Sequence, residues 1–330
     1  MRPLLLLLPL CAVACAHGAA ATTGSDDDPR LLRGSGVDPG ALACNREQRW
    51  GETLRPDSEA AAADLLAALA PRLAPMSDEE RAATREQLRK LVFWRLVRAV
   101  LLEGDNNNFG VVPLRGYHFV DSEGVTRPVL LFRTGFTPAP ERPGSCYRSL
   151  LGAGVRHVVN LFDGDIPAAD LVAQESRAAA AAGASYHVAT DEEGGGYGPW
   201  RDLLRKHYEE PAAWEKAMAA VARLVREQLL RPGGAAPRGH LHLHCGGGMH
   251  RTGMIVGVVE KCVNGAPMEE VEAHYRRHVG WRDPAHPGGA EEGNLRFLRD
   301  FDCARLAPAP GHGSPSPPRA LPTVETATAD

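Results

Sequence analysis

The residues best suited to chemistry lie in one stretch, His244-Cys245-Gly246-Gly247-Gly248-Met249-His250-Arg251-Thr252-Gly253. Alternating leucines and histidines precede it and an apolar run follows it, so the pattern predicts a strand, a glycine loop and a helix. Three consecutive glycines let the backbone curl so that several N–H groups point inward at the start of a helix. The stretch therefore predicts a loop that binds a phosphate group.

Two side chains of this loop suit attack on a bound phosphate. Arg251 can hold two phosphate oxygens through its planar guanidinium. Cys245 lies in the same positive field, which should lower the pKa of the thiol and favour the nucleophilic thiolate. Thr252 can hydrogen-bond the sulfur and help it leave when a phosphocysteine intermediate is hydrolysed, and His244 would tune the cysteine from behind. This chemistry implies no cofactor.

The spacing His-Cys-x-x-Gly-x-x-Arg-Thr resembles the phosphate loop of the cysteine-dependent protein tyrosine and dual-specificity phosphatases. The resemblance implies a catalytic group made of Cys245, Arg251 and Thr252, supported by His244. It also implies that the loop holds the substrate phosphate, through Gly246, Gly247, Gly248, Met249, His250 and Arg251.

A second element carries the same resemblance. Arg133-Thr134-Gly135 is similar to the short Arg-Ser/Thr-Gly element near the start of bacterial members of that family. A helix that ends near Gly152, followed by a buried strand over 156–162, resembles the family's next step. Arg133 could contact the phosphate or serve as a structural ion-pair partner, and the sequence leaves both open.

Other interpretations of the loop are weaker. A dinucleotide turn of the G-x-G-x-x-G type would need glycine where Arg251 stands. A metal site built from His242, His244, Cys245 and His250 lacks a carboxylate or a second cysteine. A phosphate-binding relative without catalytic activity stays open as a second class of function.

A general acid is needed to protonate the leaving oxygen. Asp191 follows a predicted strand and opens a glycine-rich loop that could close over the site. The resemblance places the family's acid after the corresponding strand, although the gap to Cys245 is longer than usual and implies an insertion around residues 194–208. Glu192, Glu193 and Asp202 are rival acids, and a solvated acidic turn is the alternative without function.

The elements predict an α/β fold with a mostly parallel central sheet flanked by helices, like that of the protein tyrosine phosphatases, with an N-terminal helical extension. Strands are predicted at 117–120, 129–132, 156–162, 185–190 and 240–244. The predicted divisions are a signal peptide over 1–15, a disordered linker over 16–56, the helical extension over 57–104, a catalytic domain over 110–306 and a disordered tail over 307–330. In the extension, Ser77 and Glu80 form a predicted capping box, and Pro71 and Pro75 are expected to end the first helix at about Ala70.

The N-terminus resembles a bacterial export signal. A leucine run too short to span a membrane leads to Ala12-Val13-Ala14-Cys15, which is similar to a lipoprotein cleavage box with Cys15 as the lipidated residue. Simple secretion is the alternative. We therefore expect a periplasmic or outer-membrane-associated protein held at the membrane by its lipid.

Composition bears on partners and redox state. A formal net charge of −4 argues against a nucleic-acid partner, and 44% hydrophobic residues permit a large core. Because phosphoinositide-type relatives carry lysines inside the loop and this chain has none there, a phosphorylated protein is the expected substrate, with an inositol phosphate or phospholipid as the alternative. In an exported protein four cysteines could pair while Cys245 stays free, or they could be buried thiols: Cys44, Cys146, Cys262 and Cys303.

Overall fold

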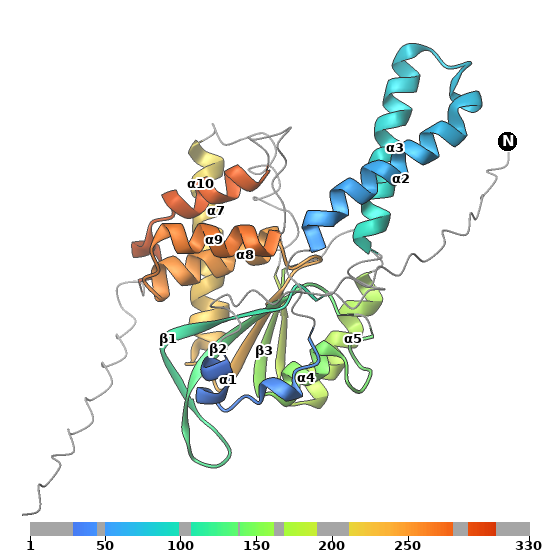
Figure 1. The fold of residues 1–330 in the computed structure, drawn as a ribbon. Helices are drawn as coiled ribbons and strands as arrows, with labels where there is room; N and C mark the ends of the chain where they lie inside the picture. The colour runs from blue at the N-terminus through green and yellow to red at the C-terminus, as the bar shows by residue number, and fades with distance from the viewer. Residues whose placement is uncertain are drawn as a thin grey trace, which may run out of the picture.

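The computed structural model describes residues 29–44, 50–98, 107–137, 139–161, 168–189, 211–279 and 290–307. Its centre is a five-stranded sheet with the order β1-β2-β5-β3-β4 (Figure 1). β2, β5, β3 and β4 are parallel and β1 pairs antiparallel with β2. The strands are β1 Gly110–Val120, β2 Thr126–Thr134, β3 Val155–Asn160, β4 Ser185–Val188 and β5 His240–His244. The predicted α/β architecture is confirmed, whereas the signal segment with Cys15 and the residues from 308 onward lie outside the described ranges.

Helices cover both faces of the sheet (Figure 1). One layer contains α1 Pro29–Gly34, α4 Cys146–Gly152 and α5 Ala168–Ala181. The other contains α7 Pro211–Leu224, α8 His250–Val258, α9 Met268–Val279 and α10 Ala290–Asp300, with π-helical continuations η5 Val225–Leu230 after α7 and η7 Val259–Val263 after α8. Three short 3₁₀ turns complete the described elements: η2 Pro39–Ala41, η6 Pro232–Gly234 and η8 Cys303–Leu306.

Alternation along β5 divides its side chains between the two layers. Leu241 and Leu243 belong to the core under α7–α10. The histidines face the other layer, where His242 packs against Tyr147 of α4 with ring centroids 5.7 Å apart. Because successive strand residues point to opposite faces, one strand supplies apolar side chains to one core and polar rings to the other. His242 and His244 therefore share one face of β5, where their rings stack with centroids 5.1 Å apart.

The predicted linker over 16–56 is wrong for the stretches that the structure describes. Residues 29–44 form α1 and η2 and dock on the sheet, with Leu32 0% and Val37 2% exposed among residues of the core that includes Phe132. Residues 50–56 belong to α2 Trp50–Leu73. Residues 29–44 are held on the sheet by Leu32, Val37 and the disulfide of Cys44. The Gly- and Pro-rich composition around these residues gives no periodic pattern, so the sequence did not indicate that they are ordered.

The helical extension forms a hairpin of α2 and α3 Asp78–Arg98 (Figure 1). The predicted capping box is confirmed, since the Glu80 carboxylate accepts from the Ser77 N–H at 3.0 Å and the Ser77 hydroxyl accepts from the Glu80 N–H at 3.3 Å. α2 continues past Pro71, contrary to expectation, and ends at Leu73, before Pro75. A proline in the last turn removes only its own N–H, and the Ala74 N–H still donates to the Ala70 carbonyl at 3.0 Å.

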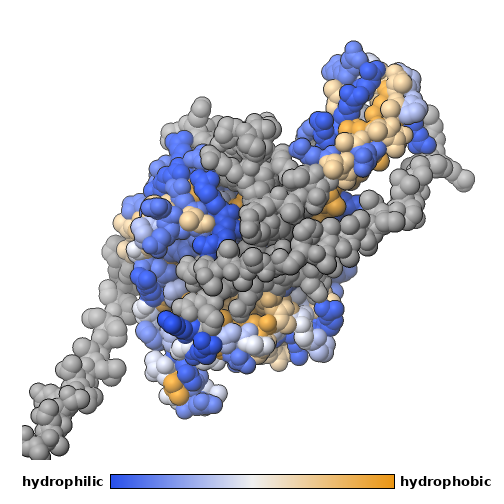
Figure 2. All heavy atoms as spheres, viewed as in Figure 1, coloured by the Kyte–Doolittle hydropathy of each residue, from blue (hydrophilic) through white to orange (hydrophobic). Residues whose placement is uncertain are grey.

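The hairpin presents apolar side chains beside hydrophilic ones on its surface (Figure 2). Leu91 of α3 is one of the large apolar side chains on this surface and is 63% exposed. Among the described helices, none combines the length and the apolar character needed to cross a membrane.

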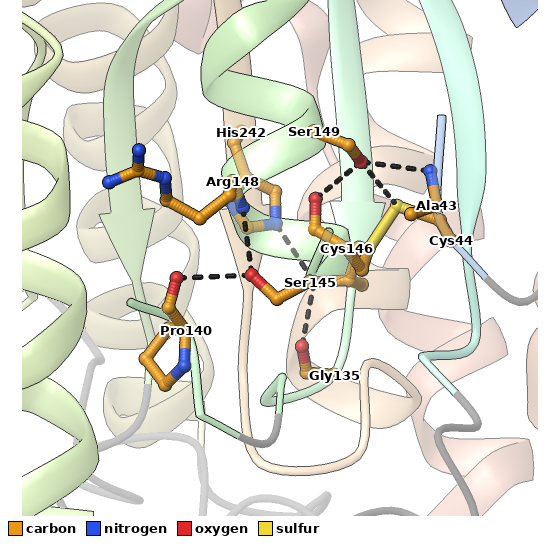
Figure 3. Close-up of a disulfide and its surroundings, with 10 residues drawn as sticks. Ala43, Cys44, Gly135, Pro140, Ser145, Cys146, Arg148, Ser149 and His242 are labelled. Atoms are coloured by element: carbon orange, nitrogen blue, oxygen red, sulfur yellow. Dashed lines mark hydrogen bonds between the residues drawn. A yellow bond between two sulfur atoms is a disulfide. The ribbon is translucent and has the colours of Figure 1, made fainter. Parts of the chain in front are cut away.

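Two disulfides join segments that are distant in sequence. Cys44 pairs with Cys146 at the start of α4 (Figure 3), and Cys262 of η7 pairs with Cys303 of η8. The hydroxyl of Ser149, one turn along α4, accepts from the Ala43 N–H at 3.0 Å beside the first disulfide (Figure 3). The structure thus decides the pairing that the sequence left open.

The disulfide that closes the larger loop is expected to stabilise the fold more. The pairs Cys44–Cys146 and Cys262–Cys303 are separated by 102 and 41 residues, and loop-closure entropy grows with that separation. We expect the double variant Cys44→Ser/Cys146→Ser to lose about 2–5 kcal/mol of unfolding free energy in urea titrations, and Cys262→Ser/Cys303→Ser to lose somewhat less. Two variants as stable as the parent chain, or the reverse order, would contradict this.

Candidate active site

The glycine loop connects β5 to α8 at the carboxyl edge of the sheet, as the sequence predicted. β5 ends at His244 and α8 begins at His250. The neighbouring strand β2 pairs Thr134 with His244, which places Arg133-Thr134-Gly135 alongside the start of the loop. Two motifs far apart in sequence are therefore joined by parallel strand pairing.

Gly248 is the position at which the loop approaches β2 most closely. Its φ is +66°, a conformation that favours glycine. A Cβ built there would lie 2.5 Å from the Thr134 carbonyl carbon and 2.6 Å from the Gly135 nitrogen. Those atoms belong to the backbone and cannot rotate away. Both the conformation and the available space therefore require glycine at the central position of the motif.

Three consecutive carbonyl groups of the loop are held from outside. The Gly246 oxygen accepts from the Phe136 N–H, which follows β2, at 3.0 Å. The Gly247 oxygen accepts from Asn108 Nδ2, before β1, at 3.1 Å, and the Gly248 oxygen accepts from Arg133 Nη2, in β2, at 2.6 Å. In a trans peptide the N–H points opposite to the C=O. The N–H groups that follow these carbonyls are therefore turned toward the inside of the loop, which is the arrangement of an anion-binding nest.

Cys245 lies under this nest with 4% of its surface exposed, and it is the free cysteine of the described residues. Burial raises the pKa of its thiol, but the charge of Arg251 and hydrogen bonds from Thr252 and from the Gly248 N–H bring the net pKa below its ordinary value. The Thr252 hydroxyl has no other hydrogen-bond partner within the described part of the chain. It is therefore available to the sulfur, whose ionisation the loop favours.

Arg251 is fixed by the end of β3. Its Nη1 donates to the Leu161 carbonyl, and the Leu161 N–H donates to the His244 carbonyl at 2.7 Å. Leu161, the residue after β3, thus contacts His244 on one side of Cys245 in the chain and Arg251 on the other. Because only 5% of Arg251 is exposed, the guanidinium is a buried charge next to the sulfur, and a phosphate dianion would compensate it.

The remaining predicted loop residues, Met249 and His250, are half-buried at the start of α8. Burial, followed by the charge of Arg251, lowers the pKa of His250 to about 4. The ring is therefore neutral at pH 7, and Arg251 is the formal cation of the loop itself. His244, predicted to support the cysteine, points into the α4–α5 layer behind the loop.

The proposed general acid lies outside the described residues. Asp191 and its rivals Glu192, Glu193 and Asp202 all fall in the undescribed range 190–210. β4, the strand before them, ends at Val188, parallel to β3 and on the far side of β3 from β5. β4 therefore ends at the same edge of the sheet as the phosphate loop, and Ala189 is the last described residue before Asp191.

Two supporting residues had roles that the sequence did not reveal. Asn108 is 0% exposed, and its Nδ2 also donates to the His278 carbonyl at 2.9 Å, which links the loop to α9. Arg133 contacts the loop through the carbonyl of Gly248. Neither contact has a local signal in the sequence, because the partner is distant in the chain.

No group of three or more His, Cys, Asp or Glu side chains suited to a metal ion occurs among the described residues.

Comparisons with known proteins give one structural likeness. No protein-family model matches the sequence, and no curated protein matches it significantly. The fold is similar to the crystal structure of the core catalytic domain of PP-IP phosphatase SIW14 from S. cerevisiae in complex with citrate, with 18% sequence identity and a TM-score of 0.32. The match covers 58% of this chain and 89% of that one.

The close approach at Gly248 predicts a sharp response to one added methyl group. Gly248→Ala should lower the turnover of an aryl phosphate at least a hundredfold and reduce the unfolding free energy by about 2 kcal/mol or more, since strain and a backbone clash act together. Gly265→Ala is the matched control, because Gly265 has φ +67° and open space around its Cβ position. It should cost about 1 kcal/mol and leave turnover unchanged. Equal effects of the two substitutions on turnover would contradict this account of the loop.

Proposed function

We propose that this chain is a phosphatase that hydrolyses phosphate monoesters through a phosphocysteine intermediate. The observation that carries the proposal is the geometry around Cys245. Its sulfur lies beneath a curve of inward N–H groups and beside the guanidinium of Arg251, which together lower the pKa of the thiol. An anion site with a nucleophile at its floor suits in-line attack on phosphorus.

The reaction follows from these groups. Cys245 Sγ forms a bond to phosphorus while the bond from phosphorus to the ester oxygen breaks, and the leaving oxygen takes a proton from the general acid, which we assign to Asp191. The loop N–H groups and Arg251 stabilise the charge on the equatorial oxygens. Water, deprotonated by the same carboxylate, then attacks phosphorus and releases the thiolate. The Thr252 hydroxyl stabilises that leaving sulfur.

We propose a phosphorylated protein as the substrate, on tyrosine or on both tyrosine and serine/threonine. The loop interior has no lysine and its histidine is neutral at pH 7, so the loop itself offers one formal cation, Arg251. That suits a single phosphate monoester better than a densely phosphorylated ring. An inositol phosphate or phospholipid is the competing substrate class, which the assay below distinguishes.

The reduced chain should hydrolyse p-nitrophenyl phosphate, and Cys245→Ser should abolish that activity. Asp191→Asn should slow phenyl phosphate far more than p-nitrophenyl phosphate, by up to about 10²–10⁴-fold, because a poor leaving group depends on protonation. The same change at Glu192, Glu193 and Asp202 identifies the acid if Asp191 is not it. Phosphotyrosyl and phosphoseryl peptides and inositol hexakisphosphate are then compared by kcat/KM.

The outcomes separate the classes of function. Phosphate binding by calorimetry without turnover of any ester would replace the enzyme with a phosphate-binding module. Preferred hydrolysis of inositol hexakisphosphate or of a phosphoinositide would overturn the protein substrate but retain the mechanism. Residual activity in Cys245→Ser equal to that of the parent chain would remove the cysteine mechanism.

We also propose that the chain is exported and lipidated at Cys15. The two disulfides support export, because structural disulfides persist mainly in oxidising compartments. In a bacterial host the full chain should sediment with membranes, and mass spectrometry should find an acylated N-terminal peptide that begins at Cys15. Cys15→Ser should move the protein to the soluble fraction. An unmodified residue 15 at the mature N-terminus would instead indicate simple secretion.

A further inference from the structure

The peptide between Gly247 and Gly248 contacts both the sulfur and a side chain from outside the loop. Its N–H donates a hydrogen bond to Cys245, which helps to lower the pKa of the thiol. Its carbonyl accepts from Asn108 Nδ2 at 3.1 Å. Because N–H and C=O point in opposite directions in a trans peptide, the side chain that holds this carbonyl also decides whether the N–H faces the sulfur.

A peptide with glycine on both sides needs such an anchor. Glycine adopts positive and negative φ about equally well, so neither Gly247 nor Gly248 opposes rotation of the peptide between them. The two neighbouring loop carbonyls are held by the Phe136 N–H and by Arg133. Within the described ranges, the hydrogen bond to the carbonyl between those two comes from Asn108.

The amide of Asn108 is itself fixed in one orientation. Its Nδ2 also donates to the His278 carbonyl at 2.9 Å, at the end of α9, where carbonyl groups lack partners within the helix. Because the NH₂ group faces two carbonyl oxygens, Oδ1 is the atom that faces His278 Nδ1 at 2.9 Å, and that ring nitrogen carries the proton. If the amide turned over, its oxygen would face the oxygen of a carbonyl.

The backbone around Asn108 explains why asparagine suits this position. Its φ is +48°, in the left-handed region where asparagine is enriched. On one side the Asn107 carbonyl accepts from the Gly135 N–H at 2.7 Å, and on the other Phe109 is 0% exposed and stacks on Phe132 with centroids 6.0 Å apart. The position therefore requires a side chain that tolerates positive φ and donates to two carbonyls.

We propose that Asn108 is a positioning residue for Cys245: its amide fixes the Gly247–Gly248 peptide with the N–H toward the sulfur and fastens that peptide to the end of α9. The N–H held in this way favours the thiolate over the thiol. The consequence for catalysis rests on the proposed function, whereas the ionisation of the thiol is measurable without turnover.

Within the described residues, the charged and titratable groups around the loop come from four elements: His244 of β5, Arg133 of β2, His250 and Arg251 of α8, and His278 of α9. Arg251 acts on the sulfur by its charge. Burial, followed by that charge, lowers the pKa of His250 to about 4. An uncharged substitution of Asn108 replaces none of these groups, so a change in thiol ionisation would report on the peptide.

The test measures the rate at which iodoacetamide alkylates Cys245 as a function of pH in the full chain, followed by peptide mass mapping. Asn108→Gly tolerates the positive φ and removes the amide without a change in charge. We expect the midpoint of the alkylation profile to rise by about one pH unit, which makes alkylation about tenfold slower on the acid side. The acid limb of the kcat/KM profile should move by the same amount.

Asn264→Gly is the matched control. Asn264 is 8% exposed and its amide also donates to a carbonyl, that of Pro113 at 2.8 Å, so it ties the residue after η7 to β1 and not to the loop. The same substitution there removes the same chemical group and should leave both profiles unchanged.

An Asn108→Gly variant that is less stable than the parent chain yet keeps both parental profiles would overturn the proposal and leave Asn108 a structural residue. If that variant does not fold, Asn108→Ser takes its place, because its shorter side chain withdraws the donor from both carbonyls, and Asn264→Ser becomes the control. A parental midpoint in Asn108→Ser overturns the proposal equally.

The two proposals fail in different ways. A raised midpoint in Asn108→Gly, in a chain that hydrolyses no phosphate ester, would sink the proposed function and support the role of Asn108 in thiol ionisation. An unchanged midpoint in a chain that does hydrolyse phosphate esters would sink the role of Asn108 alone.

Discussion

The contact of Gly248 with the backbone of Thr134 and Gly135 is the constraint on which the rest of the site depends. It brings the loop so close to β2 that the loop carbonyls are within reach of Phe136 and Arg133. With those carbonyls held outward, the peptide N–H groups turn inward with no further adjustment when an anion arrives. A preorganised loop of this kind stabilises a charged transition state without reorganisation during the reaction. Gly248 is therefore required for two reasons: only glycine fits beside the β2 backbone, and this close approach turns the loop N–H groups inward.

The polar groups behind the loop form a second level of organisation. One face of β5 carries leucines into an apolar core, whereas its other face carries histidines into a layer that contains a carboxylate, hydroxyls and an amide. Buried polar groups are tolerated when each has partners, and here most partners come from different elements. His242 is matched by Thr134 of β2, and Glu175 of α5 is matched by Tyr186 of β4 and His244. The network therefore ties the strand before Cys245 to both neighbouring strands and to the helix above them.

The ordered N-terminal segment and the disulfides add rigidity around this arrangement. Residues 29–44 cover part of the α4–α5 layer, and Cys44–Cys146 fixes them to the helix whose Tyr147 packs against His242 (Figure 3). The second disulfide joins the end of the helix that follows the loop to the C-terminal turn. Covalent links therefore lie on both sides of the sheet. Cys245 is not part of either link, so its thiol is available for chemistry in a chain whose other described cysteines are oxidised.

The sequence by itself determined the glycine loop and the alternation of strands and helices, because each depends on neighbours along the chain: glycine spacing, a period of two in the strands and a period near 3.6 in the helices. Through resemblance it also singled out Arg133-Thr134-Gly135, but it left open whether Arg133 contacts the phosphate or forms a structural ion pair. Only the tertiary structure decided that Asn108 and Arg133 hold the loop carbonyls, which cysteines pair, and that residues 29–44 dock on the sheet. Those facts depend on which strands and helices lie side by side. The physical reason is that hydrogen bonds, ion pairs and disulfides act over a few ångströms between residues that can be more than a hundred positions apart, and no local pattern records such a partner.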